Sequence, residues 1–162
     1  MTISAGSTLP EASFWFSVPM APKSSIWPTR LKGRKVVIFG LPGAYTGTCT
    51  TAHVPSFMRT KDAFAAKGVD EIICVSVNDP FVMKAWGDST GATEAGITFA
   101  GDADGSFTAA LGLEFSAPAV GLIGRSKRYA LYAEDGLVKV LHVEESPGIC
   151  EASGGESLLA AI

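Results

Sequence analysis

The chain has 162 residues, a net charge of −3 and a composition that is 47% hydrophobic and 18% charged. This length is typical of one globular domain, and the apolar content excludes a mainly disordered chain. The slightly negative charge gives no positive field for phosphates, so we expect no nucleic-acid partner. No apolar stretch approaches the roughly 20 residues that cross a bilayer, so we expect no membrane partner either.

The three cysteines, Cys49, Cys74 and Cys150, are widely spaced and form no CxxC pair. An odd number in this arrangement argues against both a disulfide scaffold and a zinc site, so no metal is expected. The N-terminus has no basic segment followed by an apolar one, as a secretory signal would have. A cytoplasmic location fits best, and an organellar mature form whose targeting peptide was removed is also compatible with the sequence.

The regular elements begin after a proline-rich start. Residues 1–30 favour short extended pieces and turns over a helix. A β-branched run predicts a buried strand at residues 35–40, and helical spacing of apolar and small residues predicts a helix at residues 49–66. A second core strand is expected at residues 71–77. The next helix is expected at residues 81–86, with Asp79 as its N-cap and Pro80 at its first position.

The second half of the chain contains a hairpin signal. Asp135-Gly136 separates two β-type runs, at residues 128–132 and 137–143. Short helices are expected at residues 107–112 and 156–162. Strand, helix, strand, helix in the first half implies parallel pairing with right-handed crossovers. The fold class is therefore α/β: a central mixed sheet flanked by helices on both faces, a thioredoxin-like layout, in a single domain over residues 1–162, since no repeat or linker marks a boundary.

The segment with most chemical content is Gly40-Leu-Pro-Gly-Ala-Tyr-Thr-Gly-Thr-Cys-Thr-Thr-Ala-His53. A strand ends there in a Pro/Gly loop, which delivers Cys49 to the start of a helix. Unpaired backbone N–H groups and the positive end of the helix dipole both favour a thiolate at that place. Two interpretations follow from position alone: a reactive cysteine, or a buried one that acts as a small hydrophobic residue.

The same segment resembles a known family. Pro42-x-x-x-Thr46-x-x-Cys49 has the spacing of the peroxiredoxin active-site motif, and residues 39–57 as a whole resemble the type II, or Prx5-like, branch. Residues 72–83, residues 124–131 and Asp135-Gly136 also resemble that branch. The resemblance implies a thiol-dependent peroxidase that reduces hydrogen peroxide and alkyl hydroperoxides without a cofactor.

The resemblance also implies roles for four residues. Cys49 would be the peroxidatic nucleophile, which becomes a sulfenic acid, and Thr46 would be its hydroxyl partner. Pro42 would shield the sulfur, and Arg125 would place a guanidinium beside it. Attack of a thiolate on the O–O bond needs preorganised hydrogen-bond donors, which Arg125, Thr46 and the Cys49 backbone N–H can supply.

Three further residues are candidates for the substrate pocket. His53 follows Cys49 by one helical turn, and its ring is expected behind the sulfur, in a structural or substrate-pocket role. Gly47 and Thr48 directly precede the cysteine. Many members of the family have proline at the position of Gly47, and glycine leaves the loop freer.

The sulfenic acid has to be reduced by a second thiol. Cys150 follows Pro147-Gly148 in an expected loop, where a thiol can move. Cys74 lies in an apolar strand and reads as a buried core residue, although some plant relatives assign the resolving role to this place. An external thiol is the third route, so glutathione with glutaredoxin, or thioredoxin, is the expected reductant. The resemblance further implies a homodimer.

Other interpretations have less support. Gly87-Asp-Ser89-Thr-Gly91 fits the G-x-S-x-G elbow of serine hydrolases, but no strand precedes it and no clear helix follows. Asp102-Ala-Asp104-Gly105 resembles part of a calcium loop, lacks the required glutamate and spacing, and is interpreted as a turn. The non-enzyme alternative is a redox-sensing module that uses a reactive Cys49 without steady turnover.

Overall fold

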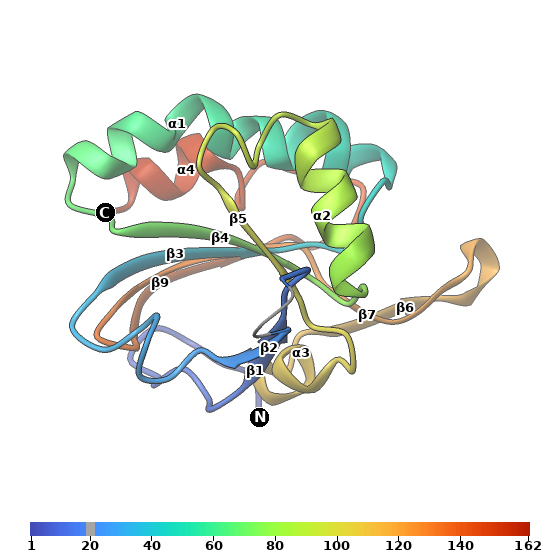
Figure 1. Ribbon diagram of the computed structural model, residues 1–162, viewed down its shortest axis with the longest axis horizontal. Helices are drawn as coiled ribbons and strands as arrows, with labels where there is room; N and C mark the ends of the chain where they lie inside the picture. The colour runs from blue at the N-terminus through green and yellow to red at the C-terminus, as the bar shows by residue number, and fades with distance from the viewer. Residues whose placement is uncertain (19–21) are drawn as a thin grey trace.

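A mixed β-sheet forms the centre of the computed structural model, which describes residues 1–18 and 22–162. β3, β4 and β5 are parallel to one another, and the other pairings are antiparallel. The seven strands lie in the order β2-β1-β5-β4-β3-β8-β9 (Figure 1). Their bounds are β1 Ser13–Trp15, β2 Lys23–Ser25, β3 Lys35–Gly40, β4 Glu71–Ser76, β5 Thr98–Gly101, β8 Tyr129–Glu134 and β9 Leu137–Val143.

Helices cover both faces of this sheet, as predicted. Figure 1 shows α1, α2 and α4 on one face, and α3 on the other. The helices are η1 Cys49–His53, α1 Val54–Ala66, α2 Pro80–Ser89, α3 Ser106–Leu111, η2 Pro118–Val120 and α4 Gly155–Ala160. A separate hairpin of β6 (Glu114–Ala117) and β7 (Leu122–Ser126) projects to the side of the molecule (Figure 1).

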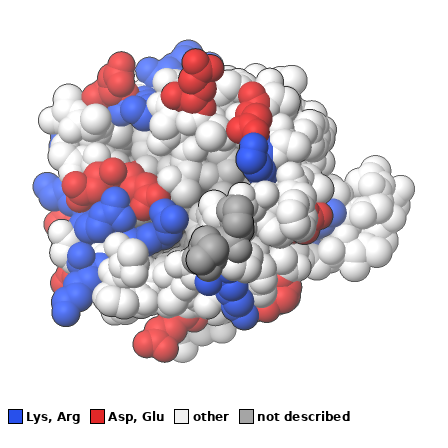
Figure 2. Space-filling model, viewed as in Figure 1, with Lys and Arg blue, Asp and Glu red and all other residues white. Residues whose placement is uncertain are grey.

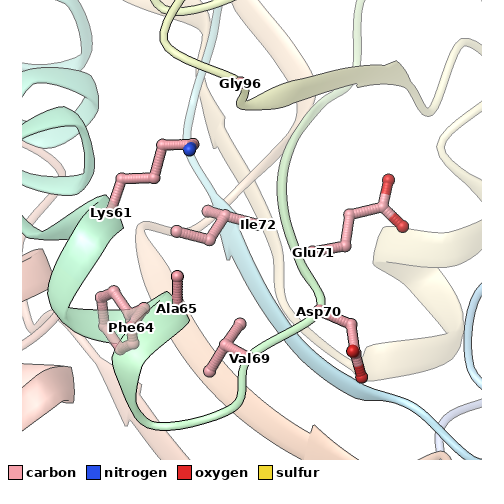
Figure 3. A pocket seen from close by; sticks show the side chains of 8 residues that line it. All are labelled: Lys61, Phe64, Ala65, Val69, Asp70, Glu71, Ile72 and Gly96. Carbon is pink, nitrogen blue, oxygen red and sulfur yellow. The ribbon is translucent and has the colours of Figure 1, made fainter.

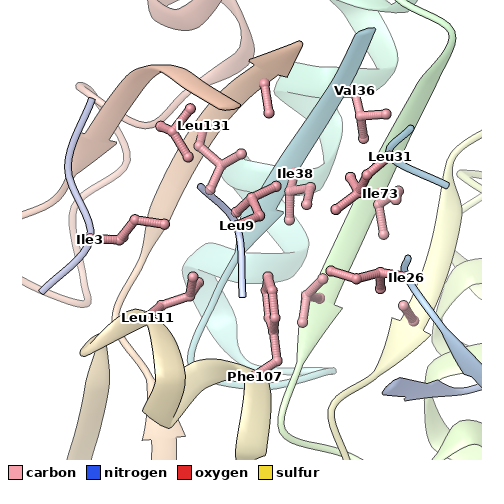
Figure 4. Packing of buried hydrophobic residues seen from close by; sticks show 14 of the residues in the cluster. Ile3, Leu9, Ile26, Leu31, Val36, Ile38, Ile73, Phe107, Leu111 and Leu131 are labelled. Carbon is pink, nitrogen blue, oxygen red and sulfur yellow. The ribbon is translucent and has the colours of Figure 1, made fainter. Parts of the chain in front are cut away.

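Alternation along β3 builds two cores, one on each side of the sheet. Val36 and Ile38 face a cluster that includes Phe107 of α3, shown in Figure 4. Val37 and Phe39 face the cluster that contains Cys49. Successive side chains of a strand point to opposite faces, so a strand buried on both sides reads as the continuous apolar run seen in the sequence.

Local sequence signals explain where several elements start and turn. The Asp79 carboxylate accepts hydrogen bonds from the backbone N–H groups of Phe81 and Val82, at 2.9 Å each, and so caps α2 as predicted. Asp135 and Gly136 both have positive φ, 50° and 73°, as a tight hairpin turn between β8 and β9 requires. The predicted hairpin is confirmed.

The sequence did not predict all of the strands. β5 and the β6–β7 hairpin were not expected, because both segments are short and lack clear alternation. The extended pieces expected within residues 1–30 are confirmed as β1 and β2, and residues 19–21 of that stretch lie outside the described residues.

Charges are interspersed on the face in Figure 2, where basic and acidic side chains lie next to one another. Among the helices of residues 1–18 and 22–162, none combines the length and the apolar character that a membrane span needs.

Candidate active site

The loop between β3 and η1 is anchored to the end of the neighbouring strand β4. The Asn78 side-chain oxygen accepts a hydrogen bond from Ala44 N at 3.0 Å and another from the Ser76 hydroxyl at 2.7 Å. Tyr45, at the turn of the loop, has a φ of 63°, a conformation that costs energy for a residue other than glycine. These contacts hold the loop in a fixed path from the sheet to Cys49.

Cys49 lies at the first turn of a helix, as predicted. Thr50 N donates to Thr46 O at 3.1 Å and opens the helical hydrogen-bond ladder. The backbone N–H groups of Gly47, Thr48 and Cys49 precede this bond, and within the described residues they donate no hydrogen bond. The site therefore presents unpaired N–H groups and the positive end of a helix beside the sulfur. The first turn, Cys49–His53, is a π-helix, a local form often found at functional sites.

The guanidinium beside the sulfur is that of Arg128, which corrects the expectation for Arg125. Arg128 Nη2 donates to Cys49 Sγ at 3.2 Å. Arg125 Nη1 instead donates to the carbonyl of Pro42 at 3.2 Å, so it supports the loop that leads to the cysteine. Arg128 is the residue before β8, whose neighbour is β3, whereas Arg125 lies in β7 of the separate hairpin. Both residues lie in the segment that resembles the family, and spacing alone does not separate them.

Arg128 is a buried cation. It is 2% exposed, and no carboxylate lies within 4.0 Å of it in the part of the chain that the structure describes. Its hydrogen bonds go to Pro147 O, to His53 and to the Cys49 sulfur. A buried charge is costly unless a counter-charge is near. The one group among these partners that can carry a negative charge is Cys49.

His53 is a buried hydrogen-bond partner of Arg128. It is fully buried, with Nδ1 at 3.1 Å from Arg128 Nη1 and Nε2 at 3.0 Å from Ser153 O. Burial, and then the charge of Arg128, lower the pKa of His53 from 6.5 to about 3. The ring is therefore neutral at physiological pH. Since a carbonyl only accepts, Nε2 carries the proton and Nδ1 accepts from Arg128.

Four other predicted residues lie in the segment that leads to Cys49. Pro42 is buried, and the Thr46 hydroxyl donates to Gly43 O at 2.7 Å. Thr48 is half-buried and donates its hydroxyl to Gly148 O at 3.2 Å. Gly47 is exposed, and a Cβ at this position would meet no atom within 4 Å.

The other two cysteines differ in burial and in the part of the fold that holds them. All three cysteines are free thiols, and Cys49 and Cys74 are both 0% exposed. Cys74 lies in β4, paired with β3 and β5, and burial raises its pKa well above the usual range. Cys150 is half-buried in the loop between β9 and α4, and partial burial raises the pKa of its thiol too.

A depression at the other end of α1 is structural. Figure 3 shows Lys61, Asp70 and Glu71 at its edge, and no cysteine lines it. Arg30 and Arg34 both pair with Glu71, so its charge is already compensated. Within the described residues, no three His, Cys, Asp or Glu side chains gather in a way that could hold a metal ion.

Comparison with known proteins agrees with this geometry. The family model named Redoxin matches residues 4–159. A mitochondrial peroxiredoxin-2F of Arabidopsis thaliana is 52% identical over 81% of the chain, and the match spans 65% of that relative. The solved structure of reduced Prx3 with hydrogen peroxide from Vibrio vulnificus is 43% identical, with 99% of this chain and 100% of that one covered and a TM-score of 0.88.

A more distant structure shares the fold. Peroxiredoxin 5 of Alvinella pompejana is 30% identical, with 98% of this chain and 97% of that one covered and a TM-score of 0.86. The chain belongs to the redoxin family and, within it, to the peroxiredoxins. The thioredoxin-like fold and the type II, Prx5-like resemblance are thus confirmed.

Two residues of the site were missed by sequence reasoning: Arg128 and Asn78. Asn78 follows a predicted buried strand directly, and polar residues at the carboxyl ends of parallel strands often line sites, so its position was a usable signal. Arg128 could be placed only by the pairing of β8 with β3.

Proposed function

We propose that this chain is a thiol-dependent peroxidase that reduces hydrogen peroxide and alkyl hydroperoxides at Cys49. The observation that carries the proposal is the buried Arg128, whose one potential anionic hydrogen-bond partner among the described residues is the Cys49 sulfur, 3.2 Å away. The pair stabilises a thiolate at the start of a helix. The Vibrio vulnificus relative, described as bound to hydrogen peroxide, supports the choice of substrate.

The proposed reaction is a nucleophilic displacement on oxygen. The Cys49 thiolate donates an electron pair to one peroxide oxygen, the S–O bond forms and the O–O bond breaks. The leaving oxygen takes a proton and departs as water or an alcohol. The sulfur loses two electrons to the peroxide and becomes a sulfenic acid. Arg128 and the free amides of the first helical turn donate to the oxygens as charge develops on them.

Thr46 and Pro42 shape the loop in this scheme. The Thr46 hydroxyl is fixed by its bond to Gly43 O and keeps lone pairs free to accept from the peroxide. Arg125 holds the Pro42 carbonyl and therefore acts on the loop and not on the sulfur. In this proposal Gly47 and Thr48, which directly precede Cys49, border the peroxide, and His53 supports Arg128.

The sulfenic acid is then resolved by Cys150 or by an external thiol. Cys74 would have to leave a central strand that pairs on both sides, whereas Cys150 lies in a loop. Opening a loop costs less than opening a core strand. Peptide mapping after one equivalent of peroxide tests this: a Cys49–Cys150 disulfide or an unbridged Cys49 agrees with the proposal, and a dominant Cys49–Cys74 disulfide contradicts it.

The reductant is proposed to be glutathione with glutaredoxin, or thioredoxin. Steady-state peroxide consumption with each donor, and with dithiothreitol as a general thiol, distinguishes them. Continued turnover with any of the donors supports an enzyme. A protein that stops after one equivalent with every donor would instead be the redox-sensing module.

A homodimer in the cytoplasm completes the proposal. Large apolar side chains are exposed, and such surface often marks an interface; three free cysteines suit a reducing compartment. Light scattering after size-exclusion chromatography tests the dimer, and a fluorescent fusion tests the location. The exposed side chains are Val18, Tyr45, Phe81, Val120, Ile123 and Ile149.

A further inference from the structure

The loop between β9 and α4, residues 144–154, lies against the site, and we call it the strap. Three side chains of the site hold three of its carbonyls. Arg128 donates to Pro147 O at 2.8 and 3.1 Å, and Thr48 donates to Gly148 O at 3.2 Å. His53 Nε2 donates to Ser153 O at 3.0 Å. The strap also carries Cys150, so the segment that contacts Arg128, Thr48 and His53 also holds a second thiol.

Glu144, at the base of the strap, closes this segment on itself. One carboxylate oxygen, Oε1, accepts from Glu151 N at 2.7 Å, from Ser153 N at 2.8 Å and from the Ser153 hydroxyl at 2.9 Å. Hydrogen bonds to an ionised acceptor are about twice as strong as neutral ones. The Glu144 backbone N–H donates to Arg128 O at 2.9 Å, which ties the same residue to the arginine.

A continuous chain of hydrogen bonds runs from Glu144 to the sulfur. Glu144 fixes the backbone of Ser153, whose carbonyl accepts a hydrogen bond from the Nε2–H of His53. This leaves Nδ1 of His53 to accept from Arg128 Nη1, and the other terminal nitrogen of Arg128 donates to the sulfur. Each link fixes the orientation of the next group, because a planar guanidinium held at one nitrogen directs the others.

We propose that Glu144 is a positioning residue that keeps the strap closed and, through Ser153 and His53, holds Arg128 on Cys49. Loss of Glu144 is then expected to slow the reaction at Cys49 and to make Cys150 more accessible. Arg128 is held less firmly, so peroxide reacts more slowly with Cys49. The strap opens more often, so Cys150 becomes easier to reach. The inference rests on the proposed peroxidase function for the first effect, whereas the second effect needs no peroxide at all.

Alkylation of the reduced protein tests the second effect without any peroxide. The rates at which a small uncharged maleimide labels Cys150 and Cys74 are followed by mass spectrometry. Glu144→Ala is expected to label Cys150 about tenfold faster than the parent, and Glu144→Gln, which keeps an acceptor oxygen, by a smaller factor. Cys74 reports general loosening, because its strand lies between β3 and β5. Its labelling is expected to stay unchanged.

Glu145→Ala is the matched control, because Glu145 is the next residue, is exposed and makes no side-chain hydrogen bond within the described residues. Glu145→Ala is expected to match the parent in the labelling rate of Cys150 and in the single-turnover oxidation rate of Cys49. Single-turnover oxidation of Cys49 is expected to slow in Glu144→Ala and to recover in part in Glu144→Gln. Labelling of Cys150 no faster than in Glu145→Ala, parallel acceleration at Cys74, or, in a parent that does react with peroxide, an unchanged oxidation rate in Glu144→Ala would each overturn the proposal. If neither the parent nor any variant reacts with peroxide while Cys150 alone becomes accessible in Glu144→Ala, the proposed peroxidase function is wrong. The proposed role of Glu144 in keeping the strap closed then still holds.

Discussion

Arg128 Nη2 lies 3.2 Å from Cys49 Sγ, although 79 residues separate them in the chain. The pairing of β8 with β3 brings them together, because Cys49 follows the end of β3 and Arg128 precedes the start of β8. Antiparallel neighbours place the end of one strand beside the start of the other. The site is therefore a consequence of sheet topology and not of one local motif.

Replacement of Arg128 is expected to slow the oxidation of Cys49 far more than replacement of Arg125. Arg128→Gln removes the donor at the sulfur, and loss of one such donor typically costs about 10²–10³ in rate. Arg125→Gln removes only the bond to Pro42 O and is expected to have a much smaller effect. Stopped-flow single-turnover kinetics with hydrogen peroxide measure both. Equal losses in the two variants would show that Arg128 has no special role.

His53 makes the folding stability depend on pH. Its pKa is lowered from 6.5 to about 3, so the unfolded chain binds a proton at a pH where the folded chain does not. Its contribution is complete above pH 6.5 and is lost as the pH falls toward 3. At pH 5 the loss is about 2 kcal/mol relative to pH 7.5.

Urea unfolding at pH 7.5 and pH 5 tests this dependence on His53. His53→Gln lowers stability at both values but is expected to remove most of the difference between them that the parent shows. His142→Gln is the control, since His142 is only partly buried. If His53→Gln retains the full difference, the buried neutral ring is not its source.

Gly47 and Gly43 in the cysteine loop are expected to respond in opposite directions. A Cβ at Gly47 meets nothing within 4 Å, so Gly47→Ala is expected to raise the free energy of unfolding by about 0.4–1 kcal/mol. A Cβ at Gly43 would lie 2.6 Å from Arg125 Nη1 and would displace that side chain from Pro42 O. Gly43→Ala is therefore expected to lower stability. Thermal unfolding of the two variants, followed by circular dichroism, checks the sign of each change.

Patterns within one segment predicted the larger elements of the fold. The apolar runs of β3 and β4, the Asp79 cap and the Asp135-Gly136 turn are all local signals, and the structure confirms each of them. The strands β5, β6 and β7 were missed because each has five residues or fewer and depends on its partner strand.

Some residues of the site could likewise be predicted from a local motif, and others could not. Cys49, Thr46 and Pro42 lie in one motif, and the start of the helix at Cys49 could be inferred from it. Whether Arg125 or Arg128 contacts the sulfur depends on how the chain before β8 is placed beside Cys49. The role of Glu144 depends on the path of the strap. Residue spacing along the sequence predicts neither of them, because both follow from contacts between segments far apart in the chain.

In the proposed reaction, the Cys49 sulfur is the group that peroxide oxidises. Single-turnover consumption of hydrogen peroxide by the fully reduced protein tests it most directly, with Cys49→Ser compared against Cys74→Ser and Cys150→Ser. We expect Cys49→Ser to consume no peroxide on the time scale of the parent, and the two other variants to consume one equivalent at nearly the parent's rate. Consumption by Cys49→Ser at a rate close to that of the parent would show that another group reacts with peroxide.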